Sequence, residues 1–582
     1  MTPSRHARRT AFRMRICLLA IAFVLSLFAA RLFQLQGLDG NAYASMATAE
    51  GSASVPLHAS RGAILDRFGS ELASTIDAVA LTADPMMTSA KAPEVAAILT
   101  RHLHLDYFAT VAKLRRPESR FVYLERRVPT WRANAVMADL EAARLPGVFT
   151  ERDPLRTYPG DEIAANVVGL VGANGTGLAG LEQQYDEQLS GVDGLATYIV
   201  SPAGERIPLA DTSVQQPQPG VAVQTTIDRD VQWYTDRRLH EAVVDTRSDW
   251  GAVISLDVRT GQIVQFSQYP TFDPNVSAKR DIDKLSARGV QNVYEPGSVE
   301  KILTFAALSD AGKVTPRTRM KVPGALWIDG HEVNDDWSHG MIRLTATGVL
   351  AKSSNLGTVL ASRRLSDEML YDYLRSFGLG DVTGIGLPGE SRGLLPEPSI
   401  WADINHATIA FGQGLSVTVA QMAAAVAAVA NGGTYVQPSL VSGFVEADGS
   451  VTPAPEPASH RVVSERAARQ VSQMLEAVIL DGGTAPLAAI PGYRVAGKTG
   501  TAQRVNPESG RYVAGQRTIS FAGFAPADDP RFMTYVVLDN PKDGSFGGTA
   551  AAPVFQDVMS MLLQRYAVAP TGTKQPSRAL EW

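Results

Sequence analysis

The second half of this chain contains three short polar motifs with the residue types needed for acyl transfer through a serine. The five candidate catalytic residues are Ser298, Lys301, Ser353, Asn355 and Lys498. A serine hydroxyl at its ordinary pKa is a poor nucleophile and needs an adjacent base. We expect Lys301 to be that base, because burial and a second cation, Lys498, would both lower its pKa.

The remaining polar residues can complete the reaction. Ser353 can pass a proton to the leaving amine, and Asn355 can hold both the substrate amide and the lysine. The backbone N–H groups of Ser298 and Thr501 are expected to form an oxyanion hole.

Three residues after Lys498 are expected to bind substrate. Thr499 and Thr501 can hold a substrate carboxylate beside the lysine charge. Gly500 is expected to keep the strand edge open, so that a peptide can add to it as an extra strand.

The serine must be positioned by the element that follows it. Apolar residues recur there at helical spacing, at Val299, Ile302, Leu303, Ala306 and Ala307. This pattern predicts an amphipathic helix that opens at Ser298 and sets the Lys301 amine one turn above the hydroxyl.

The other elements predict an α+β domain around an antiparallel five-stranded sheet. The expected strands are 252–257, 262–269, 493–496, 518–525 and 532–539, and the expected helices include 418–430, 464–480 and 555–566. We place Lys498 directly after the third strand, with Gly497 as a hinge. Two strands at the start of a domain, three at its end and helices between them favour this class.

The composition of the chain limits the classes of function that it can have. The chain has 582 residues, of which 45% are hydrophobic and 19% charged, with a net charge of −5. These values are typical of a globular protein of two or three domains and give no indication of nucleic-acid binding. Its single cysteine, Cys17, excludes disulfides and cysteine metal sites within one chain, and we expect neither a metal nor a cofactor.

The N-terminus predicts a membrane anchor. Five arginines precede an apolar run, and no acidic residue comes before Asp39. We expect a cytoplasmic arm at 1–15, a transmembrane helix at 16–36 and everything later outside the membrane. The alternative is a cleaved signal peptide with a site at 42–44 or 47–49.

We place a domain boundary at the Pro/Gly-rich break 215–220. Residues 37–220 are expected to be a non-catalytic pedestal (dimerisation-like) domain, in which motifs such as Arg61-Gly62 and Arg156 are structural, through buried Arg–Asp pairs and turns. Residues 221–566 are the expected catalytic domain, and 567–582 a flexible tail.

The motif order Ser-x-x-Lys, Ser-x-Asn, Lys-Thr-Gly is that of β-lactamases and penicillin-binding proteins. The chain as a whole resembles a class B penicillin-binding protein, most closely the division-type peptidoglycan D,D-transpeptidase. Further motifs that carry the resemblance are Arg61-Gly62, Asp66-Arg67, Phe121 to Leu124, Arg156, Tyr158-Pro159, Gly180 to Glu182, Thr226 to Asp228, Gly330 to Glu332, Phe411 to Gly414, Gly547-Gly548 and Ala552 to Phe555.

The resemblance implies a penicillin-binding/transpeptidase fold: a five-stranded sheet flanked by helices, an all-helical subdomain, an elongated α/β pedestal and one transmembrane helix. It implies that Ser298 is acylated by D-Ala-D-Ala pentapeptide strands of peptidoglycan and by β-lactam antibiotics. It also implies a cell-membrane location and work in septal wall synthesis with a polytopic membrane glycosyltransferase and other divisome proteins.

The sequence shows two departures from the family pattern. Val299-Glu300 replaces the usual Thr-Val or Thr-Phe pair, and Phe546 stands where tyrosine is frequent. We expect Glu300 to face solvent; pointing inward, it could tune Lys301. His331 and His339 are expected to have structural or surface roles, with no metal.

Three alternatives stay open at this point. A β-lactamase or carboxypeptidase would use water as the acceptor, but would leave the pedestal and anchor unexplained. A catalytically silent β-lactam-binding scaffold or sensor would need a signalling module, which a short cytoplasmic arm does not supply. An elongation-type transpeptidase of the same class would use the same chemistry.

Overall fold

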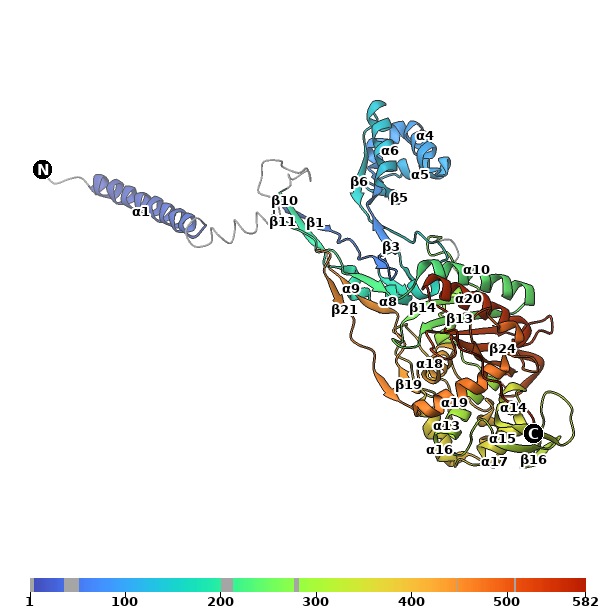
Figure 1. Cartoon of the computed structure of the whole chain (residues 1–582). Helices are drawn as coiled ribbons and strands as arrows, with labels where there is room; N and C mark the ends of the chain where they lie inside the picture. The colour runs from blue at the N-terminus through green and yellow to red at the C-terminus, as the bar shows by residue number, and fades with distance from the viewer. Residues whose placement is uncertain (1–4, 36–51, 200–212, 277–281, 447, 507–508) are drawn as a thin grey trace. The chain divides into compact units, whose positions relative to one another are not determined.

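The computed structural model describes residues 5–35, 52–199, 213–276, 282–446, 448–506 and 509–582 (Figure 1). The chain divides into two compact units. One consists of Met1–Ala59 and Val192–Gln218, and the other of Ser60–Gly191 and Pro219–Trp582.

The first unit contains an apolar helix and a small sheet. Helix α1 (Arg5–Phe33) includes Phe12–Phe33, which is long and apolar enough to cross a membrane. These 22 residues rise about 33 Å, close to the thickness of a bilayer core. The predicted anchor overlaps this helix, while residue 36 and both candidate cleavage sites lie outside the described residues. Strands β1 (Ser52–Leu57), β10 (Gly194–Ile199) and β11 (Ser213–Gln215) form an antiparallel sheet.

The second unit is built on a five-stranded antiparallel sheet, as predicted. Its strand order is β14 (Ile263–Tyr269), β13 (Trp250–Asp257), β25 (Phe532–Asp539), β24 (Tyr512–Ala525), β23 (Ala496–Val505). Helices α10 (Arg229–Thr246) and α20 (Ala552–Arg565) pack on the sheet and on each other. Every residue of α18 (Val419–Ala430) is buried, because the helix lies between the sheet and further helices.

Strand β23 differs from the prediction. It begins at Ala496 and continues through Lys498 to Val505, so the Lys-Thr-Gly motif lies on the strand and not after it. Gly497 is therefore no hinge. A Cβ atom there would lie 2.5 Å from the ring of Phe521, so glycine is required by close packing across the strands.

The helix after the serine also differs. Gly297–Val299 forms a 3₁₀ turn, and α13 (Lys301–Asp310) follows it. All residues from Lys301 to Leu308 are buried, so the helix is not amphipathic. It is a central helix, packed against α15 (Asn355–Ser362), α16 (Asp367–Ser376), α18 and α19 (Glu465–Leu475). Glu300 is buried with it, which corrects the expectation that this side chain faces solvent.

The remaining helices between the strands form the predicted helical subdomain. Helix α14 (Ala346–Ala351) precedes α15, and α17 (Asp403–Ala410) precedes α18. The helix predicted at 464–480 is shorter, because a 3₁₀ turn replaces it from Glu476–Val478.

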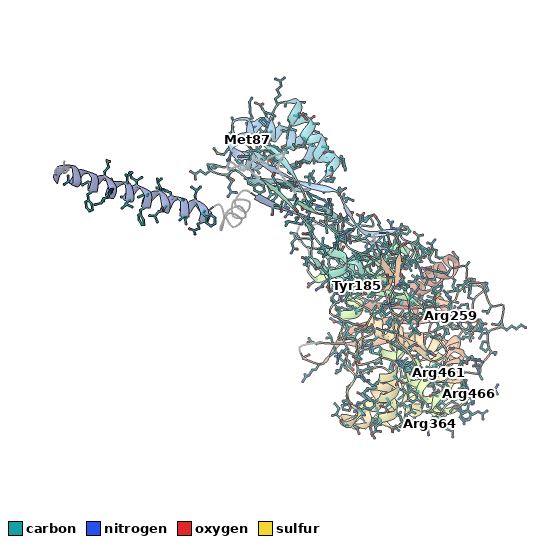
Figure 2. All side chains as sticks on the ribbon, turned by 90° about the vertical axis from the view of Figure 1, so that its left-hand side faces the viewer. Met87, Tyr185, Arg259, Arg364, Arg461 and Arg466 are labelled. Carbon is teal, nitrogen blue, oxygen red and sulfur yellow. The ribbon has the colours of Figure 1, made fainter. Side chains whose placement is uncertain are left out.

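Residues on both sides of position 220 share one sheet. Its strand order is β21 (Val451–Pro453), β20 (Val441–Val445), β12 (Ala222–Thr225), β2 (Ile64–Leu65), β3 (Glu71–Ile76), β7 (Leu155–Thr157). Tyr185, labelled in Figure 2, packs edge to face on Phe444 of β20. Strands from both sides of position 220 thus lie in one sheet, while the chain passes from the first compact unit to the second between Gln218 and Pro219, inside the predicted break.

Buried arginines fix the chain around this sheet. Arg61 and Arg156 each donate to the carboxylate of Glu182, at 2.6 and 2.7 Å, and Glu182 is fully buried. The structural role expected for these arginines fits this network, although the central acid is a glutamate and not an aspartate.

A second core lies in the three-stranded sheet of β4 (Ala78–Ala83), β5 (Val122–Pro129) and β6 (Val148–Arg152). Helices α4 (Ala92–Leu103), α5 (Tyr107–Leu114) and α6 (Thr130–Ala142) supply its other side. Met87, labelled in Figure 2, is exposed on this part of the chain.

The C-terminal residues, expected to be loose, make specific contacts instead. The Thr345 hydroxyl donates to the carbonyl of Ala579 at 2.7 Å, and Lys352 pairs with Glu581 at 2.9 Å. Trp582 lies under two guanidinium groups, those of Arg319 and Arg343. An edge of the helical subdomain is thus covered by the end of the chain.

Candidate active site

The fold brings the three predicted motifs together. Ser298 lies in the 3₁₀ turn before α13, and Asn355 begins α15. Lys498 lies on β23, the edge strand of the central sheet. Both lysines are fully buried, whereas Ser298 is partly exposed at the surface of a cavity.

Lys301 is held by two short hydrogen bonds. Its Nζ donates to the backbone carbonyl of Ser353 and to Oδ1 of Asn355, both at 2.7 Å, and Ser353 Oγ lies 3.4 Å away. A neutral amine has two N–H bonds and one lone pair. Because the two short bonds use both N–H groups, the lone pair is left to accept a proton.

The Ser298 hydroxyl makes no side-chain hydrogen bond within the part of the chain that the structure describes. The expected contact between Ser298 and Lys301 is therefore not present at rest. Hydrogen bonds of this kind often shorten only when substrate binds.

Burial favours the neutral form of both lysines. Desolvation lowers the pKa of Lys301 to about 8, against an opposing effect of Asp335 and Asp336. Burial, and then the charge of Lys301, place the pKa of Lys498 well below its usual value. The first cause in both cases is burial, and the second cation matters for Lys498 more than for Lys301.

Ser353 joins the two lysines. Lys498 Nζ donates to Ser353 Oγ at 2.8 Å and to the Thr499 carbonyl at 3.1 Å. Ser353 has a φ of 61°, in the left-handed region that is unfavourable for a serine. This turn, between α14 and α15, directs both its carbonyl and its hydroxyl toward the lysines.

Asp335 fixes the start of α15, and the sequence did not identify it. Its carboxylate accepts from the Ser354 hydroxyl at 2.7 Å, from the Leu356 N–H at 3.0 Å and contacts His339 Nε2 at 2.9 Å. The group is buried, so these contacts replace its water. The role of His339 is structural, as expected. No periodic pattern marks Asp335, because its segment is irregular.

Of the three predicted substrate-binding residues, two line cavities and the third is buried. Thr499 and Thr501 line the cavities beside Ser298. Gly500 is buried, and a Cβ atom there would lie 2.3 Å from Ser520 Oγ and 2.9 Å from Val299. Glycine at this position thus lets β23 pack against the Ser298 turn, and the expectation that it keeps the strand edge open to a peptide stays a prediction.

Two cavities meet at the serine. The larger, of about 710 Å³, is lined by Ser298, Asn355 and Thr501, together with Phe411 and Gln413. The smaller, of about 260 Å³, also contains Ser298 and Thr501 and continues past Ser353, Thr499 and Phe546. A ligand therefore has room on both sides of Ser298.

Two further polar residues, Asp336 and Tyr512, line these cavities, and Glu295 forms a hydrogen bond with Tyr512. Asp336 lines both and is the acid whose charge raises the pKa of each lysine. Glu295 accepts from the Gly414 N–H at 2.8 Å and from the Tyr512 hydroxyl at 3.1 Å. Glu295 could have been noticed from its place three residues before Ser298, whereas Asp336 and Tyr512 carry no motif.

Family models match most of the chain. Residues 251–560 match the penicillin binding protein transpeptidase domain, and residues 56–225 match the penicillin-binding protein dimerisation domain. All eight predicted site residues fall in the first of these ranges.

Relatives and solved structures give the same match over nearly the whole length. The chain is 37% identical to penicillin-binding protein PbpB of Mycolicibacterium smegmatis, over 98% of this chain and 93% of that protein. It is 34% identical to peptidoglycan D,D-transpeptidase FtsI of Escherichia coli, over 88% of this chain and 84% of that protein. Penicillin binding protein 3 of Mycobacterium tuberculosis, solved in complex with ampicillin, matches with a TM-score of 0.72 and 35% identity, over 91% of this chain and 100% of that one.

Proposed function

The chain belongs to the class B penicillin-binding proteins, a family of peptidoglycan D,D-transpeptidases, and from this membership we propose that it cross-links peptidoglycan stem peptides through an acyl-enzyme on Ser298. The donor is a pentapeptide ending in D-Ala-D-Ala. β-Lactams acylate the same serine.

In the first step, Ser298 Oγ attacks the carbonyl of the penultimate D-alanine. Lys301 takes the hydroxyl proton on its lone pair. The tetrahedral intermediate collapses as the C–N bond to the terminal D-alanine breaks, and the leaving amine receives a proton through Ser353. The products are free D-alanine and an ester on Ser298.

In the second step, an amine of a neighbouring stem attacks that ester. The amine loses a proton to the Lys301–Ser353 pair, the ester C–O bond breaks, and Ser298 regains its proton. A new amide bond now joins two stems, and no cofactor takes part.

Charge developing on the substrate oxygen would be held by the N–H groups of Ser298 and Thr501, a contribution of about 3–4 kcal/mol for a single donor in comparable sites. The terminal carboxylate of the donor would lie against the hydroxyls of Thr499 and Thr501, near Lys498.

One observation carries this proposal. Lys301 is fully buried and its Nζ lies 2.7 Å from both the Ser353 carbonyl and Asn355 Oδ1, so that its neutral form would use both N–H bonds there and keep a lone pair for the serine. A silent binding scaffold has no need of a buried amine held in this way, because burial imposes a desolvation cost on the charged form of a lysine.

Labelling with a fluorescent penicillin tests the function. The full-length protein in detergent should be labelled, and Ser298→Ala should abolish the label. Label that survives Ser298→Ala would overturn the assignment of the nucleophile. Failure of the wild type to label would favour the scaffold.

We place the catalytic domain outside the cell membrane. The arginines before Phe12–Phe33 favour a cytoplasmic N-terminus and a single pass through the membrane. The anchor and the pedestal then offer surfaces to a polytopic glycosyltransferase and to other divisome proteins during septal wall synthesis. Protease added to intact spheroplasts should digest the catalytic domain; protection of that domain would contradict this orientation.

A further inference from the structure

Glu300 is a buried acid between the nucleophile and the base. Its side chain is fully buried. Oε1 lies 3.2 Å from the Thr304 hydroxyl, and Oε2 has no hydrogen-bond partner among the described residues. A carboxyl group in such surroundings has a strong preference for its neutral form.

Counting protons decides which group donates. The Thr304 hydroxyl also lies 2.8 Å from the carbonyl oxygen of Ala410. A carbonyl can only accept, so the one hydroxyl proton of Thr304 belongs to Ala410. The proton between Thr304 and Glu300 must then come from the glutamate. Burial, which raises the pKa of Glu300 well above 4.5, agrees with a protonated side chain.

The acid does not act on the adjacent lysine. Neighbouring residues on a helix point in different directions. Lys301 turns to Ser353 and Asn355, and the carboxylates that influence its pKa are Asp335 and Asp336. Glu300 points inward, yet toward a different part of the site.

That part is the wall of the larger cavity. Ala410 ends α17, so its carbonyl has no partner within the helix. The next residues, 411–414, pack against the nucleophile turn: the Gly297 N–H donates to the Gly412 carbonyl at 2.9 Å, and a Cβ atom on Gly412 would lie 2.0 Å from the Gly297 carbonyl oxygen. Phe411 and Gln413 line the cavity that contains Ser298.

We propose that Glu300 is a positioning residue, a neutral carboxylic acid that donates to Thr304 so that the Thr304 hydroxyl holds Ala410 and sets the 411–414 wall against Ser298. The inference rests on the proposed function, because it assigns the role through the acylation of Ser298. The residue touches neither substrate nor reacting atoms.

The test compares donors with non-donors at position 300 in the full-length protein. The measurement is the rate of acylation by fluorescent penicillin, together with its pH profile. Glu300→Gln keeps an N–H donor and should retain the rate within about twofold, whereas Glu300→Leu should lower it about fivefold to tenfold. The pH profile of the glutamine variant should not move. The proposal would be overturned if Glu300→Leu were acylated at the wild-type rate. It would also be overturned if Glu300→Gln lost as much of the acylation rate as Glu300→Leu.

A second pair of variants tests the path through Thr304. Thr304→Ser keeps the hydroxyl and should acylate normally, whereas Thr304→Val should be as slow as Glu300→Leu. The double variant Glu300→Leu/Thr304→Val should be no slower than either single variant. Additive losses would contradict a shared path. This pair decides the question even where Glu300→Leu does not fold.

Thr235→Val is the matched control. It removes a buried hydroxyl that bonds the Val231 carbonyl at 2.8 Å in α10, away from the cavities, and should leave acylation unchanged. If the wild type is not acylated at all, the proposed function has failed. If the wild type is acylated and Glu300→Leu is acylated at the same rate, only the role inferred for Glu300 has failed.

Discussion

Lys301 and Lys498 both reach the hydroxyl of Ser353, at 3.4 and 2.8 Å. Two ammonium groups cannot share one small oxygen in a buried site at low cost, so at most one lysine is charged there. Ser353 is therefore a bridge along which a proton can pass between the two amines and the leaving group.

This arrangement predicts a pH dependence of acylation. Lys301 acts as a base only when neutral, and burial sets its pKa at about 8. The rate of acylation by penicillin should therefore rise as the pH increases from about 6 to about 10, with a midpoint near the lysine pKa. Asp336→Asn removes a charge that raises the pKa of both lysines, so its midpoint should lie at lower pH.

Asp448→Asn, in the β20–β21 hairpin, is the control for this shift. It changes the net charge by the same amount at a position away from the site, and it should leave the midpoint of the pH profile unchanged. A midpoint that moves to higher pH in Asp336→Asn would contradict the account of the lysines.

Glu300 predicts a dependence of stability on pH. Its pKa is raised in the folded state, so above pH 4.5 the folded protein retains a proton that the unfolded chain releases. Stability from this group is present at low pH and is lost as the pH rises toward the folded-state pKa. The melting temperature of Glu300→Gln minus that of the wild type should therefore increase as the pH rises from about 5 to about 8. A constant difference across this range would mean that Glu300 is ionised in the fold.

Among the secondary-structure elements, α15 depends most on a residue outside the motifs. Asp335 accepts two hydrogen bonds at its N-terminus and contacts His339. Asp335→Ala should lower the free energy of unfolding by about 1–3 kcal/mol and slow acylation at least tenfold, because Asn355 and Ser353 lose their support. Chemical unfolding and penicillin labelling measure the two effects.

Asp106→Ala is the matched cap deletion. Asp106 caps α5 by accepting from the Ala109 N–H, in the second core of the pedestal. This variant should lose stability and keep the acylation rate. Equal acylation in Asp106→Ala and Asp335→Ala would show that Asp335 does not position the site.

Elements whose apolar residues are continuous were predictable from sequence. Strand β25 occupies the predicted residues 532–539, all of which are buried. Strand β23 was misplaced because its Lys-Thr-Gly-Thr sequence has neither apolar alternation nor β-branched continuity. The burial of α13 on all sides was also missed, because two consecutive ionisable residues, Glu300 and Lys301, are the pattern of a solvent-facing side although both are buried.

The residues of the candidate site also fall into a group that was predictable from sequence and a group that was not. Its eight motif residues were identifiable because their types and order suit one chemistry. Asp335 and Asp336 come from an irregular segment, and only the fold brings them to α15 and the lysines. The packing of Gly500 against Val299 was not predicted, since it is a tertiary contact that no local pattern encodes.

At the scale of the whole molecule, the sheet that joins residues before and after position 220 depends on Glu182. Removing this buried acid takes the carboxylate partner from Arg156 and leaves Arg61 with Asp186 alone. Glu182→Ala should lower the free energy of unfolding by about 3–5 kcal/mol. The protein that remains folded should be acylated at the normal rate, because the cavities around Ser298 include neither arginine.

Glu187→Gln, an exposed acid in the same segment, should change neither quantity. Loss of acylation in folded Glu182→Ala would contradict the structural role of the pedestal arginines. It would indicate instead that the pedestal communicates with the catalytic groups.

Transfer of an acyl group between two peptides is the central claim. The direct measurement incubates the full-length protein with a synthetic pentapeptide ending in D-Ala-D-Ala and a D-amino acid as acceptor, and follows the products by mass spectrometry. We predict release of D-alanine together with a new peptide that carries the acceptor, and loss of both products in Ser298→Ala. Release of D-alanine with only the hydrolysed tetrapeptide, or an acylated Ser298 that never turns over, would contradict the account.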